Sequence, residues 1–328
     1  MQFRTEINPD KSPVSMEHDH RILSMGSCFA SNIAQYLKRY RFRIFDNPFG
    51  VLYNPVSIHS AVKLLNENKQ FKQSDLIFHD DEWHSFFHHS DFSHHVAETC
   101  IEKLNRELSS AAEFLKTTDW LILTYGTSYV YRHKQTGIIV SNCHKIPSSE
   151  FDHFRLSADQ VYDYLQQTLR MLNRINPGIK VIITVSPVRH LKDGPVENQL
   201  SKSTLLLAED KIVNANANCF YFPSYEIMMD DLRDYRFYDS DLIHPNSAAT
   251  DYIWDKFCEV WLSPKTKTAV TKLEKLASAR AHRVRNPESP VHQKFLDKQI
   301  QFIGALKNEY TYLDLDEDLQ YFRNQKNT

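Results

Sequence analysis

The chain has 328 residues, enough for one or two domains with a large buried core. Its 41% hydrophobic and 24% charged residues are typical of a globular protein, and a net charge of −2 provides no general attraction to nucleic acid or to an anionic membrane. Five cysteines are too few for a disulfide framework. The apolar runs are short and residues 1–20 lack an apolar signal core, so we expect a soluble, cytoplasmic protein.

The predicted elements alternate between strands and helices. After an irregular arm over residues 1–20, apolar runs predict five strands, at 21–25, 41–45, 120–125, 180–185 and 219–223. Helical spacing of apolar residues occurs between and after them, at 28–40, 56–66, 97–115, 158–173, 201–215 and 245–261. This order predicts an α/β fold with a doubly wound, mostly parallel five-stranded sheet in a flavodoxin-like three-layer sandwich.

Three further segments complete the predicted organisation. Residues 129–140 are expected to form a short hairpin, and residues 71–95, rich in aromatic and histidine side chains, form a lid. The composition changes after residue 262, which predicts a main domain over 1–262 and a helical C-terminal appendage over 263–328. The basic run at 265–285 is expected to be a solvated helix face with no role in nucleic-acid binding.

Three of the seven glycines, Gly26, Gly50 and Gly126, end strand-like runs. The carboxyl ends of parallel strands share one edge of a sheet, where α/β folds place their chemistry. At the first of these positions Ser27 and Cys28 stand where a strand turns into a helix, whose N-terminus lowers the pKa of a thiol. Both are candidate nucleophiles; alternatively, Ser27 caps the helix and Cys28 is a small buried hydrophobe.

Asp241 and His244 precede the last helix predicted in the main domain. An aspartate three residues before a histidine can fold back and hold the imidazole in the tautomer that accepts a proton from a nucleophile. The chain order of nucleophile, aspartate and histidine therefore suits a catalytic triad. The alternative is an aspartate that caps a turn beside a surface histidine.

Gly-Ser-Cys-Phe-Ala at residues 26–30 resembles the signature of the GSCFA family, which groups with the SGNH/GDSL-like hydrolases. Other segments are also similar to that family, namely residues 47–50, 123–127, 142–145, 184–190 and 233–238. The resemblance spans roughly residues 20–260. It implies an SGNH-like hydrolase fold without naming a substrate.

The resemblance also implies a role for the two candidate nucleophiles. In GDSL-type enzymes the nucleophile lies two residues after the strand-ending glycine, which is Cys28 here, and Ser27 then takes the place of the aspartate. This departure leaves three alternatives open: a cysteine hydrolase, a Ser27 nucleophile and a repurposed fold. We favour Cys28, because a thiolate at a helix N-terminus is the more reactive group.

The remaining blocks of the resemblance imply an oxyanion site and the rest of the triad. Gly50 matches the glycine that offers a backbone N–H to the oxyanion, and Ser128 stands in the place of the oxyanion asparagine. Asn142 is a second candidate donor. Asp241 and His244 match the last block without departure.

Two other groups are candidates for substrate binding. Histidine spacing within 71–95 suits a metal site on one helical face, but no carboxylate pattern completes it, so we expect no metal and a pocket wall that includes Trp83 and His84. Arg189 and His190 follow the strand at 180–185. Arg189 is predicted either to hold a substrate carboxylate or phosphate, with His190 beside it, or to form a structural ion pair.

These observations favour an ester hydrolase or acyltransferase that acts on an acylated carbohydrate or another small ester, without cofactor. Cys28 or Ser27 attacks the carbonyl, His244 transfers the proton and Asp241 orients His244. The alternatives are a non-catalytic carbohydrate- or partner-binding module on the same fold, and a redox sensor that uses Cys28. The expected partner is the small-molecule substrate, and the oligomeric state is not predicted.

Overall fold

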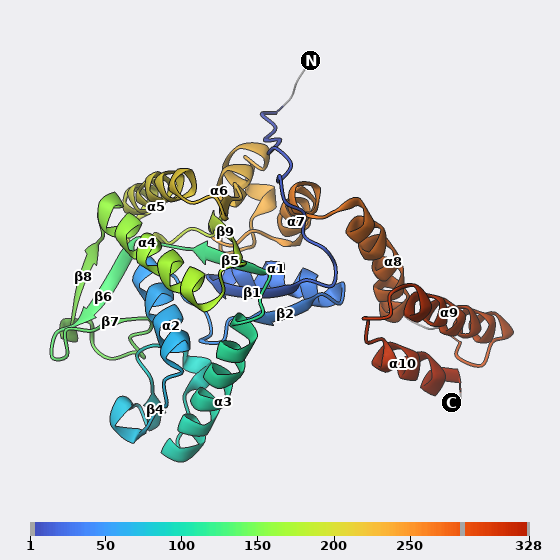
Figure 1. Cartoon of the computed structure of the whole chain (residues 1–328), viewed down its shortest axis with the longest axis horizontal. Coiled ribbons are helices and arrows are strands. Elements are labelled where there is room, and N and C mark those ends of the chain that lie inside the picture. The colour runs from blue at the N-terminus through green and yellow to red at the C-terminus, as the bar shows by residue number, and fades with distance from the viewer. Residues whose placement is uncertain (1–3, 283–285, 327–328) are drawn as a thin grey trace.

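A computed structural model describes residues 4–282 and 286–326. Its centre is a five-stranded sheet with the order β10-β9-β5-β1-β2 (Figure 1). All neighbouring strands in this sheet are parallel. The strands are β1 (Arg21–Gly26), β2 (Arg43–Asp46), β5 (Trp120–Tyr125), β9 (Lys180–Val185) and β10 (Cys219–Tyr221). The predicted doubly wound α/β fold is confirmed.

Both faces of the sheet are buried, because successive side chains of its strands point to opposite sides. In β5, Leu121 and Leu123 join one hydrophobic core, whereas Trp120 and Ile122 join the other. The helices α2 (Pro55–Glu67), α3 (Ala97–Leu115), α4 (Ala158–Ile175) and α5 (Pro195–Ala215) contribute to the first core. The helices α1 (Cys28–Arg39) and α7 (Ser247–Trp261) contribute to the second.

Smaller elements surround the carboxyl edge. A three-stranded antiparallel sheet has the order β7-β6-β8, with β6 (Tyr129–His133), β7 (Ile139–Val140) and β8 (Phe151–Arg155). The hairpin expected at 129–140 is therefore confirmed, whereas β8 was not predicted. The segment 71–95 contains the hairpin of β3 (Ile77–His79) and β4 (Glu82–His84). Short helical turns follow strands or link elements: η1 (Gln73–Asp75), η2 (Ser90–Phe92), η3 (Ser148–Glu150), η4 (Leu191–Asp193), α6 (Ser224–Glu226), η5 (Ile227–Asp231) and η6 (Tyr235–Phe237).

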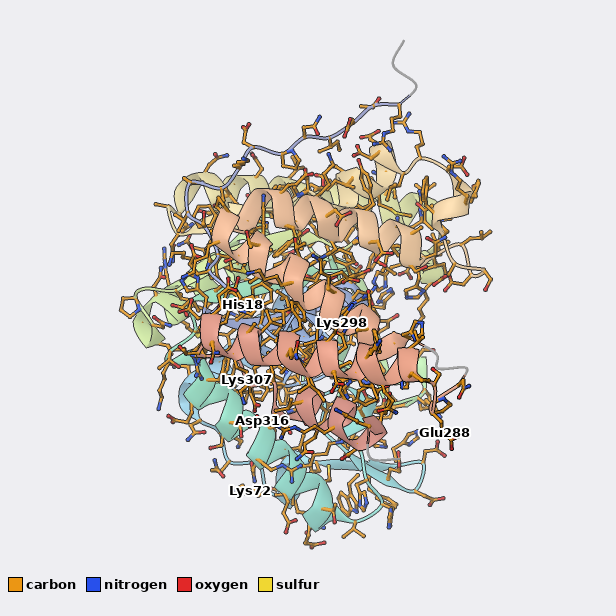
Figure 2. All side chains as sticks on the ribbon, turned by 90° about the vertical axis from the view of Figure 1, so that its right-hand side faces the viewer. His18, Lys72, Glu288, Lys298, Lys307 and Asp316 are labelled. Atoms are coloured by element: carbon orange, nitrogen blue, oxygen red, sulfur yellow. The ribbon has the colours of Figure 1, made fainter. Side chains whose placement is uncertain are left out.

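The helical C-terminal extension is confirmed. It consists of α8 (Pro264–Ala281), α9 (Pro290–Glu309) and α10 (Asp316–Lys326), which lie together at one end of the molecule (Figure 1). Figure 2 shows α9 and α10 side by side, and Lys307 of α9 pairs with Asp316 of α10 at 2.5 Å. The basic run predicted at 265–285 falls on α8, and its last three residues lie outside the described residues.

The extension shares a hydrophobic core with the sheet. Leu273, Leu296 and Phe322 are buried in the same cluster as Ile22 and Trp120. The buried carboxylate of Asp318 accepts hydrogen bonds from Arg41, at 2.7 and 2.9 Å, and from Arg280, at 2.7 Å. The division predicted at residue 262 stays a prediction.

The N-terminal arm lies against the far end of α7. The backbone N–H of Met16 donates to the carbonyl of Trp261 at 2.7 Å, and Met16 forms a parallel bridge with Leu262. The Met16 side chain is fully buried in the second core. Among the described residues, no helix is both long enough and apolar enough to cross a membrane.

Candidate active site

The turn from β1 into α1 requires Gly26. Its φ is +144°, and a Cβ there would lie 2.2 Å from the carbonyl oxygen of Thr124 on β5. The Gly26 N–H donates to Oδ1 of Asn47 at 2.9 Å, which ties the loop after β2 to the end of β1. Ser27 is the N-cap and Cys28 the first residue of α1, so both lie at the carboxyl edge of the sheet.

Ser27 and Cys28 differ in accessibility. The Ser27 hydroxyl is buried without a hydrogen-bond partner, whereas Cys28 is half-buried, and its Sγ lies 3.6 Å from the hydroxyl of Tyr53. Burial and the adjacent Cys28 sulfur raise the pKa of Tyr53, so the Tyr53 hydroxyl keeps its proton and can donate it to a thiolate. The first turn of α1 contains no acidic side chain to oppose a thiolate at this helix N-terminus.

Asp241 and His244 are joined by a short hydrogen bond. Oδ2 of Asp241 lies 2.6 Å from Nδ1 of His244, and Oδ1 accepts the backbone N–H groups of His244 and Ile243 at 3.0 and 2.8 Å. These bonds lower the pKa of Asp241 to about 2, so the carboxylate is charged at neutral pH. Because Nδ1 of His244 is engaged, Nε2 is the nitrogen left for proton transfer.

His190 contacts Tyr53. Its ring meets Tyr53 edge-on at 5.1 Å, and its buried Nε2 has no hydrogen-bond partner. Burial, together with the charges of Lys202 and His244, lowers the pKa of His190 to about 4, so this ring is neutral at neutral pH. Among the described residues, the Cys28 sulfur makes no hydrogen bond to the ring of His244.

The three residues considered for the oxyanion site already have hydrogen-bond partners. The Gly50 N–H donates to the carbonyl of Asn47 at 2.7 Å. The buried Ser128 donates its N–H and its hydroxyl to Oγ of Ser201, at 2.8 and 3.2 Å. Nδ2 of Asn142 donates to Ser90 at 3.1 Å. The donors of Gly50 and Ser128 are thus engaged elsewhere, and so is one of the two Nδ2 hydrogens of Asn142.

Tyr53 also lines a cavity of about 400 Å³, which we call the tyrosine cavity. The His153 ring stacks on Tyr131 at 4.1 Å and on Tyr129 at 4.9 Å, so one wall is aromatic. Nε2 of His153 lies 2.9 Å from Oδ1 of Asp193. The lining also includes Asn54, His89, Thr127, Asn142, Cys143, His190 and Lys192.

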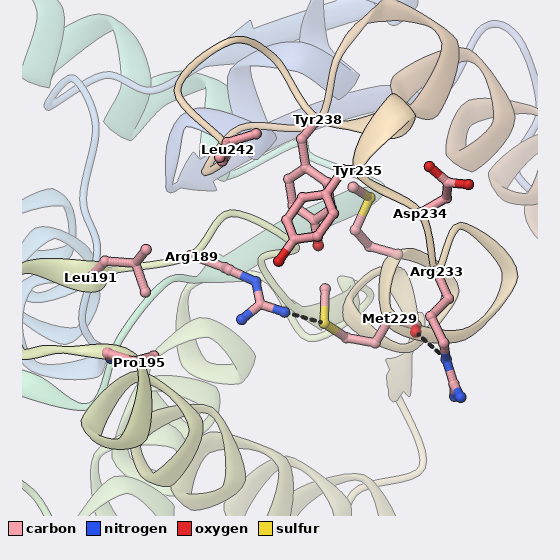
Figure 3. A pocket seen from close by; sticks show the side chains of 10 residues that line it. Arg189, Leu191, Pro195, Met229, Arg233, Asp234, Tyr235, Tyr238 and Leu242 are labelled. Carbon is pink, nitrogen blue, oxygen red and sulfur yellow. Dashed lines mark hydrogen bonds between the residues drawn. The ribbon is translucent and has the colours of Figure 1, made fainter.

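A second cavity, of about 450 Å³, contains Arg189, and we call it the arginine cavity (Figure 3). It is lined by Arg189, Leu191, Pro195, Met228, Met229, Arg233, Asp234, Tyr235, Tyr238 and Leu242. The backbone N–H of Arg189 donates to the carbonyl of Ile243 at 3.3 Å, so the wall of the cavity is joined to the Asp241–His244 segment.

Only part of the segment 71–95 reaches a cavity. His89 lines the tyrosine cavity, and its backbone N–H donates to the carbonyl of Phe49 at 2.8 Å. Trp83 and His84 lie in the β3–β4 hairpin, outside the walls of both cavities. The ring nitrogens of His84 bind Ser93 and the carbonyl of His79 at 2.6 and 2.8 Å, and no group of three or more potential metal ligands is found among the described residues.

Two residues of the site were not anticipated from the sequence. Tyr53 contacts Cys28, yet nothing local distinguishes it from the other 15 of the 16 tyrosines. Lys202, on α5, is fully buried and donates to the carbonyls of Gly126 and Ser186, each at 2.7 Å, at the ends of β5 and β9. A lysine among the apolar positions of a predicted helix was the only available signal.

Comparisons with known proteins identify a family. A model described as the GSCFA family matches residues 21–257, and a model described as the GSCFA domain protein, C-terminal domain, matches residues 273–328. No curated protein matches the chain. Among solved structures, a carbohydrate esterase family 3 from Talaromyces cellulolyticus matches at a TM-score of 0.35 and 7% identity, over 78% of this chain and 99% of that one.

Proposed function

The chain belongs to the GSCFA family, and on that premise we propose that it hydrolyses or transfers the acyl group of an ester, with the Cys28 thiol as nucleophile. One observation supports this most: the thiol is half-buried in the first turn of α1, whereas the neighbouring Ser27 hydroxyl is closed off. A nucleophile must reach its substrate, and of the two only Cys28 can do so in this arrangement.

In the first half of the proposed reaction, Nε2 of His244 takes the thiol proton and the Cys28 thiolate attacks the ester carbonyl carbon. Asp241 holds Nδ1 of His244 and stabilises the imidazolium. The developing oxyanion accepts hydrogen bonds from N–H groups at the start of α1, because the first N–H groups of a helix lack partners within it. The C–O bond then breaks, the leaving alcohol takes the proton from His244, and a thioester to Cys28 remains.

In the second half, water or the hydroxyl of an acceptor gives its proton to His244 and attacks the thioester carbonyl. The C–S bond breaks, and the acyl group leaves as the free acid or as a new ester. The Cys28 sulfur departs as a thiolate, which the Tyr53 hydroxyl at 3.6 Å is placed to stabilise before the proton returns from His244. The scheme uses no cofactor.

The tyrosine cavity supports an acylated carbohydrate or another small ester as substrate. Tyr129, Tyr131 and His153 make one of its walls aromatic, and aromatic walls suit the apolar side of a sugar ring. Polar side chains such as Asn142 and Asp193 line the same cavity and can bind hydroxyl groups. Tyr53 lines this cavity and also contacts Cys28, so the cavity is adjacent to the residue that touches the proposed nucleophile.

The test is a panel of aryl esters and acetylated sugars, assayed with the wild type, Cys28→Ala and Cys258→Ala. Cys258, on α7, is another half-buried thiol, lies outside the walls of both cavities and serves as the matched control. We expect Cys28→Ala to lower kcat/KM by about 10³-fold or more and Cys258→Ala to change it by less than about threefold. Mass spectrometry of the wild type should find the acyl group on Cys28.

Two results would contradict the proposal in different ways. Full activity in Cys28→Ala would mean that another group is the nucleophile. Binding of acetylated sugars without any turnover by the wild type would instead favour a non-catalytic carbohydrate-binding module.

A further inference from the structure

Arg189 reaches into the arginine cavity beside the Asp241–His244 segment. We propose that this cavity binds an anionic group, a carboxylate or a phosphate, that sits next to an apolar part of the ligand. The inference rests on the proposed function in one respect: it takes this ligand to be part of the ester substrate. Binding itself requires no chemistry at Cys28.

The guanidinium of Arg189 lacks the carboxylate partner that an arginine inside a protein ordinarily has. Over residues 4–282 and 286–326, no acidic side chain lies within ion-pair distance of it, and its side-chain hydrogen bond is to the thioether of Met229, at 3.4 Å. A thioether is a weak acceptor. Figure 3 shows the remaining nitrogens of Arg189 directed into the cavity, between the tyrosines and Pro195.

The other charged groups of the wall are neutralised by neighbours. Arg233 forms an ion pair with Asp230, and Asp234 accepts the backbone N–H of Arg236 at 2.9 Å and lies 3.8 Å from its guanidinium. Arg189 therefore supplies the uncompensated charge of the cavity.

Lys202 is fully buried behind this wall. Burial lowers the pKa of Lys202 to about 7; Glu209 opposes this shift and the charge of Arg189 adds to it. Lys202 is therefore only partly charged at neutral pH, and Arg189 remains the main positive charge of the cavity.

The rest of the cavity defines the second part of the ligand. Tyr235 and Leu242 are 76% and 52% exposed, and with Leu191 and Tyr238 they give the cavity an apolar and aromatic surface. A volume of about 450 Å³ suits a small organic molecule. One guanidinium beside this surface can bind a carboxylate or phosphate in a bidentate manner and hold an acyl chain or ring against the tyrosines.

The cavity is joined to the proposed proton carrier. Leu242, in its wall, lies between Asp241 and His244 in the chain, and the Arg189 N–H binds the Ile243 carbonyl at 3.3 Å. An ester with an anionic group on its acyl or alcohol part would thus be held with one end at Arg189 and its carbonyl near His244. The structure assigns Arg189 a role in selecting anionic substrates.

The test measures binding by titration calorimetry at low salt, with the full chain and three small probes. The probes are 4-phenylbutyrate, phenyl phosphate and the neutral 4-phenylbutanamide. We expect at least one anion to bind, and to bind at least about tenfold more tightly than the amide. The anion that binds identifies the group as a carboxylate or a phosphate. Equal binding of all three probes, or binding of none, would overturn the proposal.

Variants locate the site. Arg189→Gln should weaken anion binding by about tenfold or more, whereas Arg233→Gln, which removes the same charge from the same wall, should change it by less than about threefold. If Arg189→Gln does not fold, Leu242→Asp is used in its place. The added carboxylate should abolish anion binding by repulsion, whereas the neutral Leu242→Asn should retain it. Equal losses of anion binding in Arg189→Gln and Arg233→Gln, or in Leu242→Asp and Leu242→Asn, would overturn the assignment.

Failure of this proposal can be distinguished from failure of the proposed function. Cys28→Ala and His244→Ala should lose turnover and keep anion binding. An enzyme that cleaves neutral esters but binds no anion refutes the arginine cavity alone. Anion binding through Arg189 without cleavage of any ester would contradict the proposed esterase activity and leave the anion site intact.

Discussion

At the scale of single residues, the five thiols of the chain lie in different environments. Burial raises the pKa of Cys100, Cys143 and Cys258, and that of Cys219 to about 12, which keeps these four thiols protonated. Cys28 lies at a helix N-terminus beside the Tyr53 hydroxyl. We expect iodoacetamide at pH 7 to alkylate Cys28 before the other four, as read by peptide mass spectrometry, and esterase activity to fall in parallel.

The matched variants of this experiment are Tyr53→Phe and Ser27→Ala. Tyr53→Phe removes the hydroxyl near the sulfur and should slow alkylation by about 3- to 10-fold. Ser27→Ala removes a buried hydroxyl without a partner and should leave the alkylation rate unchanged. Faster alkylation of any other cysteine would contradict the assignment of Cys28 as the reactive thiol.

Gly26 is the residue that the turn into α1 depends on most directly. Gly26→Ala places a Cβ 2.2 Å from the Thr124 carbonyl oxygen at a φ of +144°, and we expect a loss of about 3 kcal/mol or more in unfolding free energy. Gly137→Ala is the control, because Gly137 also has a positive φ, of +71°, but no atom within 4 Å of the added Cβ. It should cost about 1 kcal/mol in urea unfolding. Similar losses in both variants would show that the close approach to β5 is unimportant.

At the scale of secondary-structure elements, α5 connects the ends of two strands through one side chain. Lys202→Met removes the donors to the carbonyls of Gly126 and Ser186 and leaves both oxygens buried. We expect a loss of about 2–4 kcal/mol in unfolding free energy. Lys211→Met, on the exposed face of α5, should cost less than about 0.5 kcal/mol.

The cost of Lys202→Met should depend on pH. The folded pKa of Lys202 is about 7, whereas an unfolded lysine titrates near about 10.4. Between these values the unfolded wild type binds more protons than the folded one, so its stability gains a contribution that rises with pH. Methionine does not titrate, and the difference between the two proteins should therefore be larger at pH 9.5 than at pH 7. A difference that does not grow with pH would mean that Lys202 is charged throughout this range.

The elements were largely predictable, and the contacts of the site were not. Alternating burial and helical spacing are local patterns, so the five strands of the main sheet and the helices between them follow from the sequence. β8 was missed because Phe151–Arg155 mixes polar and aromatic residues and becomes a strand through pairing with β6. Ser128 and Gly50 were taken as free donors, but their partners, Ser201 and the Asn47 carbonyl, are set by tertiary and turn geometry.

At the scale of the whole molecule, the C-terminal helices are part of the packing of the sheet. Asp318 of α10, with a side chain 2% exposed, binds Arg41 of the main sheet region and Arg280 of α8. Asp318→Asn leaves both arginines without their carboxylate, and we expect a loss of about 2–3 kcal/mol in urea unfolding and faster proteolysis of α9 and α10. Asp297→Asn, at an exposed ion pair with Lys326, should change stability by less than about 0.5 kcal/mol. Equal effects would argue against a structural role for the Asp318 cluster.

The pairing of Met16 with Trp261 and Leu262 delays part of the folding of this chain during translation. At about 5–20 residues per second, translation of 328 residues takes on the order of tens of seconds, and α7 to α10 emerge after all five strands of the sheet. Until then the side of the sheet that carries Ile22 and Trp120 is covered by α1 and by the segment that includes Ile227 and Met228. The nascent chain therefore exposes an apolar surface of the kind that chaperones bind for most of its synthesis. Its N-terminal arm can pair only after Trp261 and Leu262 have left the ribosome.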